Sequence, residues 1–95
     1  MKFVSEAKDA ITRDLLDPSA AQFRKLHIAT GGPDPALCGE INAKNRMGAY
    51  TGFKLFYVIY REGKYSGQIN VSEEPSASFE MIMLGYCSSG ITKVK

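Results

Sequence analysis

The chain has 95 residues, a formal net charge of +2 and 44% hydrophobic residues. This length allows one domain and no second core of useful size, and the composition excludes a globally disordered chain. The charge falls well short of the clustered excess that would by itself predict nucleic-acid or membrane binding. The longest apolar run, Leu55 to Tyr60, is far shorter than the roughly 20 residues that span a bilayer, so we expect no membrane-spanning segment.

Charged residues interrupt the N-terminal segment early, at Glu6, Lys8 and Asp9, whereas an export signal needs an uninterrupted apolar stretch. We therefore expect a cytoplasmic protein, with an envelope location as the alternative if a signal has been removed. In a reducing cytoplasm Cys38 and Cys87 would be free, buried thiols. The alternative is a bridge between them, which would close a loop of about 50 residues and contribute roughly 4 kcal/mol to stability.

The first predicted element is an amphipathic helix from Phe3 to Leu16. Helix-forming residues dominate this segment and it contains no glycine or proline, which favours an uninterrupted helix. Its apolar stripe, at helical spacing, consists of Val4, Ala7, Ile11 and Leu15.

Asp17 and Pro18 mark a break after this helix. The residue before a proline disfavours helical geometry, while aspartate as N-cap and proline at the first position suit a new helix. We therefore predict a short second helix from Pro18 to Arg24. Residues Leu26 to Thr30 alternate weakly and are predicted as a strand, and the glycines and prolines of 31–35 predict a loop.

Three strands in an antiparallel meander are predicted next, from Leu37 to Lys44, from Tyr50 to Arg61 and from Lys64 to Val71. Residues 45–49 and the dipeptide Glu62-Gly63 supply the two short connections. The middle strand carries apolar side chains on both of its faces. Either both faces are covered, or an edge of the sheet curls over.

The segment 75–87, PSASFEMIMLGYC, is ambiguous between helix and strand. Phe79, Ile82, Met83 and Tyr86 fit helical spacing, whereas Phe79, Met81 and Met83 also alternate as in a strand. We favour the helix and keep a final strand as the alternative.

These elements predict a single α+β domain over residues 1–95. It would combine an N-terminal helix and a short second helix with an antiparallel sheet of three or four strands and a C-terminal helix against one face. An exposed strand edge in so small a sheet would also permit a homodimer. The predicted core consists of Val4, Ile11, Leu15, Phe23, Ile41, Phe53, Leu55, Tyr57, Ile69 and Phe79.

Catalytic motifs are missing from the sequence, which contains no GxSxG, HExxH, P-loop or GxGxxG pattern. Two cysteines and one histidine are too few for a four-ligand structural zinc site. We therefore predict a protein without enzymatic activity, metal or cofactor. One catalytic alternative is that His27 approaches Cys38 across neighbouring strands and activates its thiol as a nucleophile. We prefer the structural interpretation, a strand histidine beside a packed thiol.

A cluster of polar side chains around the first hairpin is the candidate interaction surface. Amides there can pair with backbone groups, arginine can clamp a carboxylate or phosphate, and tyrosine adds contact area. Loops on rigid sheets often carry binding sites, although such side chains can also serve only their own loop. The candidate residues are Glu40, Asn42, Lys44, Asn45, Arg46 and Tyr50.

The alternative function is nucleic-acid binding by an aromatic and basic sheet surface. Its aromatic residues divide between the two faces of the predicted strands, and the RRM signature is missing from the sequence. The residues of this surface would be Tyr50, Lys54, Tyr57, Tyr60, Arg61, Lys64 and Tyr65.

Two motifs, LLDPSAAQFR from Leu15 to Arg24 and CGEINAKNRMGAYTGF from Cys38 to Phe53, resemble a family of small proteins of proteobacteria and their phages. The family pattern is similar to LxDPxSAxFR followed by CGxxNAKNxxGxYxGFxxF, and the two motifs cover roughly a quarter of the chain. Many relatives carry an export signal. The resemblance implies a shared fold but no activity, cofactor or catalytic residue. We therefore expect a non-enzymatic interaction module of bacterial or phage origin that binds a protein partner.

Overall fold

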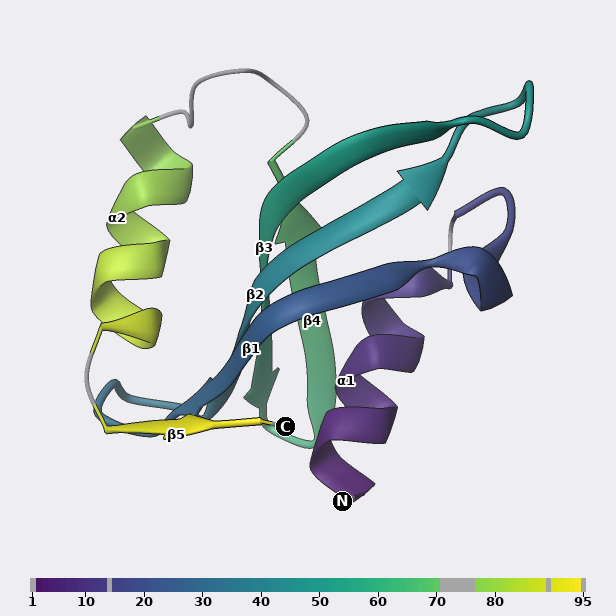
Figure 1. Cartoon of the computed structure of the whole chain (residues 1–95). Coiled ribbons are helices and arrows are strands. Elements are labelled where there is room, and N and C mark those ends of the chain that lie inside the picture. Colours follow the sequence, from purple (N-terminus) through teal and green to yellow (C-terminus); the bar gives the residue numbers. More distant parts are fainter. Residues whose placement is uncertain (1, 14, 71–76, 89, 95) are drawn as a thin grey trace.

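The computed structural model describes residues 2–13, 15–70, 77–88 and 90–94. Its five strands form one antiparallel sheet in the order β4-β3-β2-β1-β5 (Figure 1). The α+β architecture is confirmed, with one strand more than the three or four that we predicted. The elements in chain order are α1 (Lys2–Thr12), the 3-10 turn η1 (Pro18–Ala20), β1 (Gln22–Ala29), β2 (Ala36–Lys44), β3 (Tyr50–Arg61), β4 (Lys64–Ile69), α2 (Ala77–Cys87) and β5 (Ile91–Lys93).

The two helices cover opposite faces of the sheet (Figure 1). Successive side chains of a strand point to opposite faces, so the apolar run of β3 supplies both cores. Phe56 and Val58 pack in one cluster with α1, and Tyr57 and Ile59 pack in another with Phe79 of α2. Of the two explanations left open for the apolar faces of β3, the structure shows cover on both faces.

The predicted meander of β2, β3 and β4 is confirmed, and the bounds of β3 are those predicted. Glu62 and Gly63 both have positive φ, 53° and 78°, as a tight two-residue hairpin turn requires. β4 ends at Ile69, and the predicted strand end at Val71 lies outside the described residues. The predicted C-terminal helix is confirmed as α2.

The predicted second helix is wrong beyond its first turn. Only Pro18–Ala20 is helical, in a 3-10 turn, and β1 already begins at Gln22. Strand pairing outweighs local helix propensity here, because Phe23 pairs with Ile41 of β2 and its ring meets the edge of Phe56 at a centroid distance of 5.6 Å.

The predicted core is correct for most of its members but wrong for Leu55, which is 37% exposed. Leu55 lies beside Phe79 at the rim of the area that α2 covers. Phe53 is only half-buried and lies under the guanidinium group of Arg24, 3.9 Å from its ring centroid. The largest fully buried side chains are Leu37, Cys38, Ile41, Phe56 and Val58.

The fifth strand, β5, was not predicted from the sequence. It has three residues, all exposed, and it joins the free edge of β1. Backbone hydrogen bonds from Thr30 N to Gly90 O (3.2 Å) and from Val94 N to Leu26 O (3.0 Å) extend this pairing. Among the described residues, neither helix is long and apolar enough to cross a membrane.

Replacing Phe56 by alanine tests the two-sided burial of β3. Phe56 is fully buried, so Phe56→Ala should lower the free energy of unfolding by about 3–5 kcal/mol. Leu55→Ala, one position away but on the exposed rim, is the matched control and should cost about 1 kcal/mol. Urea unfolding measures both. Equal losses in the two variants would contradict the observed burial pattern.

Candidate functional site

The six candidate residues all lie on the hairpin formed by β2 and β3, toward the tip that projects away from β5 and both chain ends (Figure 1). Asn45 shapes this tip. Its side-chain Oδ1 accepts hydrogen bonds from the backbone N–H groups of Met47 (2.9 Å) and Ala49 (3.2 Å). Its backbone N–H donates to the carbonyl of Ala49 at 2.8 Å. Asn45 therefore holds the turn in one conformation.

Glu40 and Asn42 have structural contacts with β1. Arg24 Nε donates to the Glu40 carboxylate in a partly exposed ion pair. Asn42 is buried, donates to Gln22 Oε1 at 3.2 Å and accepts from the backbone N–H of Gly52 at 2.9 Å. Buried polar groups are costly unless they are hydrogen-bonded, and both ends of this amide are satisfied. Neither residue is available to a partner without loss of these contacts.

The two sequence motifs, residues 15–24 and 38–53, contact each other in the structure. The Tyr50 hydroxyl donates to the carbonyl of Ala20 at 2.9 Å, which ties the tip end of the hairpin to η1. The motifs thus form one unit, in which η1 and β1 brace β2 and β3. Its cross-motif pairs are Ala20 with Tyr50, Gln22 with Asn42, and Arg24 with Glu40.

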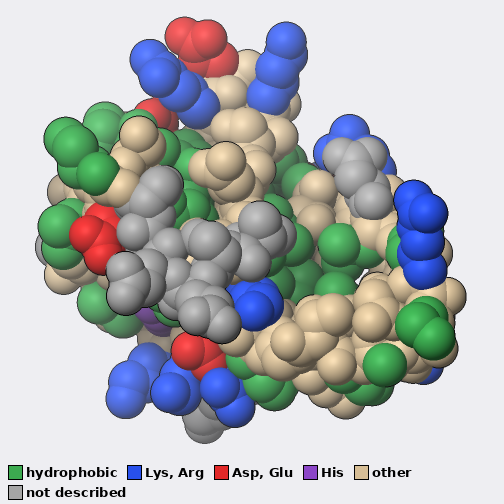
Figure 2. Space-filling view, turned by 90° about the horizontal axis from the view of Figure 1, so that it is seen from above, with side chains coloured by type: hydrophobic (Ala, Val, Ile, Leu, Met, Phe, Trp, Pro, Cys, Tyr) green, Lys and Arg blue, Asp and Glu red, His purple; other side chains and the backbone are tan. Residues whose placement is uncertain are grey.

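Other side chains at or near the hairpin tip are exposed and could contact a partner. Met47 is 91% exposed and Leu16, across an open groove, is 66% exposed. Arg46 is exposed and makes no hydrogen bond or ion pair with any residue that the structure describes. At this end of the molecule, on the right in Figure 2, cationic and apolar side chains lie at the surface together. We call the following residues the tip surface: Leu16, Lys44, Arg46 and Met47.

Two aromatic residues of the alternative, nucleic-acid-binding surface lie in opposite cores, and the other two, Tyr50 and Tyr60, are exposed. Tyr57 is buried under α2 and stacks on Phe79 at a centroid distance of 5.2 Å. On the opposite face, the Tyr65 hydroxyl donates to Glu6 Oε2 of α1 at 2.8 Å. Desolvation raises the pKa of both phenols, that of Tyr65 to about 12 with help from the Glu6 carboxylate. Because Tyr57 and Tyr65 lie on opposite faces of the sheet, their rings cannot form one stacking platform.

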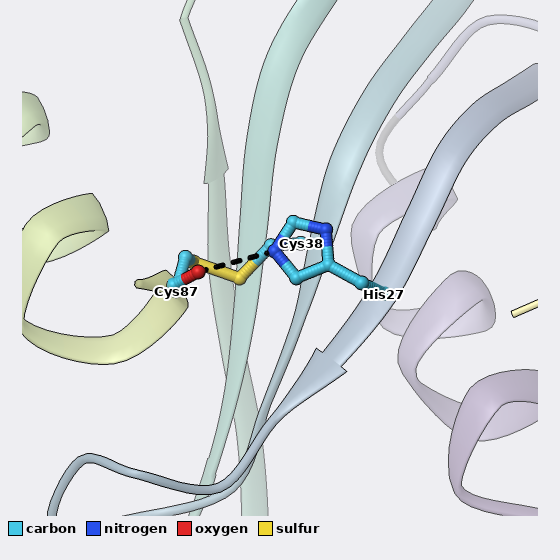
Figure 3. Close-up of side chains that lie close together, drawn as sticks. All are labelled: His27, Cys38 and Cys87. Carbon is cyan, nitrogen blue, oxygen red and sulfur yellow. Dashed lines mark hydrogen bonds between the residues drawn. A yellow bond between two sulfur atoms is a disulfide. The ribbon is translucent and has the colours of Figure 1, made fainter. Parts of the chain in front are cut away.

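Cys38 and Cys87 form a disulfide bridge, so the expectation of two free thiols is wrong. The bridge links the middle of β2 to the last residue of α2, with a Cα–Cα distance of 6.1 Å (Figure 3). Cys38 is fully buried and Cys87 is 8% exposed. The bridge fixes the C-terminal end of α2 on the sheet.

A β-bulge in β1 turns His27 toward this bridge. Arg24 pairs with Glu40 and His27 with Cys38, so Lys25 and Leu26 together oppose Gly39 alone. Without the extra residue, alternation would direct His27 to the opposite face, into the core under α1.

The bulge depends on two local features. Lys25 adopts a positive φ of 54°, which a non-glycine residue rarely does. Gly39 leaves the space that the bulged strand needs, because a Cβ there would lie 2.9 Å from Leu26 Cδ2 and 3.1 Å from the carbonyl oxygens of Arg24 and Lys25.

His27 lies against both sulfur atoms (Figure 3). Its Nε2–H donates to the carbonyl oxygen of Cys87 at 3.2 Å, and the ligand atoms of His27, Cys38 and Cys87 all lie within 4.8 Å of one another. The sequence hypothesis placed His27 beside Cys38, and the register confirms this neighbourhood. The bridged sulfur of Cys38 has no thiol to act as a nucleophile. Sequence reasoning missed Cys87 as the third member, because the bridge spans 49 positions.

No protein-family model matches the chain, no curated protein is detectably similar to it, and no solved structure matches its fold. The resemblance of its two motifs to small proteobacterial and phage proteins therefore stays a prediction.

The bridge predicts a large difference in stability between oxidised and reduced protein of the same sequence. Constraining the unfolded chain over 49 positions corresponds to about 4 kcal/mol. Urea unfolding with and without a phosphine reductant measures this difference. The protein denatured without reductant should show no reactive thiol, and reduction should release two. Two reactive thiols before reduction would show that the bridge does not form.

Proposed function

We propose that this chain is a non-enzymatic interaction module that binds a protein partner through the tip surface. The observation that supports it most is the contrast within the hairpin. Asn42, Asn45 and Tyr50 make the hairpin rigid, while Arg46 and Met47 at its tip are exposed. A rigid support lowers the entropy lost on binding, and arginine and methionine are enriched at protein interfaces.

The tip surface defines the chemistry of the partner. Met47 and Leu16 offer apolar anchors. Lys44 and Arg46 add two positive charges beside an open groove of about 450 Å³, and the Asp17 carboxylate at the same groove leaves one positive charge in excess. A complementary partner would present acidic side chains around an apolar depression that receives Met47. Of the six residues predicted from the sequence, Lys44 and Arg46 would contact the partner directly, and Glu40, Asn42, Asn45 and Tyr50 would hold the hairpin in shape.

Nucleic-acid binding remains the second candidate, carried by the exposed cations of the sheet rather than by its aromatic rings. Lys54 is half-buried and Arg61 and Lys64 are exposed, but Arg61 also lies 4.0 Å from Asp34. The separation of Tyr57 from Tyr65 by the sheet weakens this candidate, because single-stranded nucleic acids need successive stacking surfaces.

The bridge supports a proposal about the compartment. Disulfides persist in oxidising compartments and are rare in the cytoplasm. The Cys38–Cys87 bridge therefore favours the envelope alternative over the cytoplasmic location that the N-terminal charges predicted. In an oxidising compartment a small interaction module gains a covalent constraint that its modest core does not supply.

The triple variant Lys44→Ala/Arg46→Ala/Met47→Ala tests the proposal. Affinity capture from an envelope extract, run with and without nuclease, should recover a protein partner with the wild-type chain. The triple variant should bind this partner at least about tenfold more weakly, because it removes the Met47 anchor and both positive charges. The bound protein, once isolated, is titrated against both chains for a dissociation constant.

The matched control is Lys64→Ala/Lys93→Ala, which removes two exposed positive charges at the end of the molecule opposite to the hairpin tip (Figure 1). It should bind as the wild type does. Equal binding by all three chains would refute the tip surface as the site. Capture that disappears with nuclease and weakens steeply with salt would replace the proposal by the nucleic-acid alternative.

A further inference from the structure

Four soft or borderline donor groups meet where α2 ends against the sheet. Besides His27, Cys38 and Cys87, the thioether Sδ of Met83 lies 3.8 Å from Cys87 Sγ. Met83 and Cys87 are four positions apart on α2, so their side chains share one face of the helix. We call these four residues the sulfur cluster: His27, Cys38, Met83 and Cys87.

We propose that the sulfur cluster binds one Cu(I) ion when its disulfide is reduced. Thiolate and thioether ligands are soft and select Cu(I) among the common biological metals, and imidazole also binds copper. Two thiolates, one imidazole and one thioether would fill the coordination shell without a water molecule. This proposal is independent of the tip surface, which lies at the other end of β2.

The distances suit such a site once the sulfur–sulfur bond is broken. Reduction leaves the two sulfurs in contact but no longer bonded, and the Cα atoms of Cys38 and Cys87 are already 6.1 Å apart. Soft-metal bonds to sulfur are about 2.3 Å long, which places two thiolates of a tetrahedral site about 3.8 Å apart. The ligand atoms of His27, Cys38 and Cys87 lie within 4.8 Å of one another, and Met83 Sδ lies 3.8 Å from Cys87 Sγ, so small side-chain movements bring the four donors to one ion.

The position of His27 supports a ligand role. The bulge reverses the alternation of β1 at this point and carries the imidazole from the core under α1 to the sulfurs. Bulges often re-aim a side chain next to a functional site. This one needs a positive φ at Lys25 and a glycine at position 39. In the oxidised protein the imidazole donates a hydrogen bond to the Cys87 carbonyl, and the same ring nitrogen lies where it can reach a metal held by the two sulfurs.

Electrons and protons are conserved when the disulfide is exchanged for copper. A dithiol reductant gives two electrons and two protons to the bridge and becomes a disulfide itself, which leaves Cys38 and Cys87 as thiols. Cu(I) then displaces both thiol protons into solvent and binds the two thiolates. The Nε2 atom of His27 releases its hydrogen bond to Cys87 O and coordinates through its lone pair, while the ring proton resides on Nδ1. The copper ion keeps its oxidation state throughout.

The disulfide and the copper-bound state exclude each other, so the site is open to copper only when reducing equivalents reach it. Cys87 is the more exposed of the two cysteines and offers the point of attack. In the copper-bound state the metal would replace the disulfide as the link between β2 and α2.

Competition for Cu(I) with a chromophoric chelator tests the proposal. The chain is reduced with a phosphine, freed of reductant under nitrogen, and titrated into the copper(I)–bicinchoninate complex. Reduced wild-type protein should withdraw one copper ion per chain, and the oxidised protein should withdraw none. Native mass spectrometry gives the stoichiometry independently.

Two variants and one control distinguish a four-ligand copper site from copper binding by the two thiols alone. His27→Gln keeps a donor for the Cys87 carbonyl and should weaken Cu(I) binding by about 100-fold. Met83→Leu preserves the side-chain volume and should weaken Cu(I) binding by about tenfold. Met81→Leu, on the exposed side of the same helix, should bind as the wild type does. All three are first compared as oxidised proteins by thermal unfolding to show that they fold. Reduced wild-type protein that takes no copper, or unchanged affinity in both His27→Gln and Met83→Leu, overturns the proposal.

Discussion

The second half of β3 presents buried side chains to both faces of the sheet. Phe56 and Val58 pack against α1, and Tyr57 and Ile59 pack under α2. Each such side chain stabilises the fold by about 1.5–3 kcal/mol when it is removed from water, and each would expose that surface if its helix were absent. The sheet therefore needs a cover on each side, and this need determines where α1, α2 and their connections lie.

The two covers are held in different ways. Helix α1 contributes two buried apolar residues, Val4 and Ala7, and its partly buried residues Phe3, Ala10 and Ile11 pack against the same cluster. Helix α2 inserts Phe79 at one end and is bridged at the other by Cys87, while Met81 and Leu84 on its outer side remain exposed. Figure 2 shows apolar side chains at the surface on the left, on the side of the molecule where α2 lies in Figure 1. Packing alone attaches α1 to the sheet, whereas α2 also needs the disulfide bridge. The same bridge brings the residues of the sulfur cluster together.

Local pattern predicted the elements that carry a strong period, and tertiary pairing decided the rest. β3 was predicted from its long apolar run, whereas segment 75–87 fitted helix and strand, and the helix was favoured because Phe79, Ile82 and Met83 fit helical spacing. β5 is too short and too exposed to leave a signal. The bulge at Lys25 falls between the predicted helix Pro18–Arg24 and the predicted strand Leu26–Thr30, and nothing in the sequence marks it. The candidate residues do lie on one hairpin, but the sequence could not show that Asn42 is buried and hydrogen-bonded to Gln22 and Gly52 on the two neighbouring strands. Nor could it show that Cys87, far along the chain, returns to Cys38.

Hydrogen exchange of the native protein, oxidised and reduced, tests the central claim that packing holds α1 and a covalent bridge holds α2. Local opening releases the elements with the weakest attachment first. In the oxidised protein both helices should be protected. On reduction, without added metal, the amides of α2 should lose protection while those of α1 and of the centres of β2 and β3 keep most of theirs. A uniform loss of protection across α1, α2 and the sheet, or no change in α2, would contradict this account.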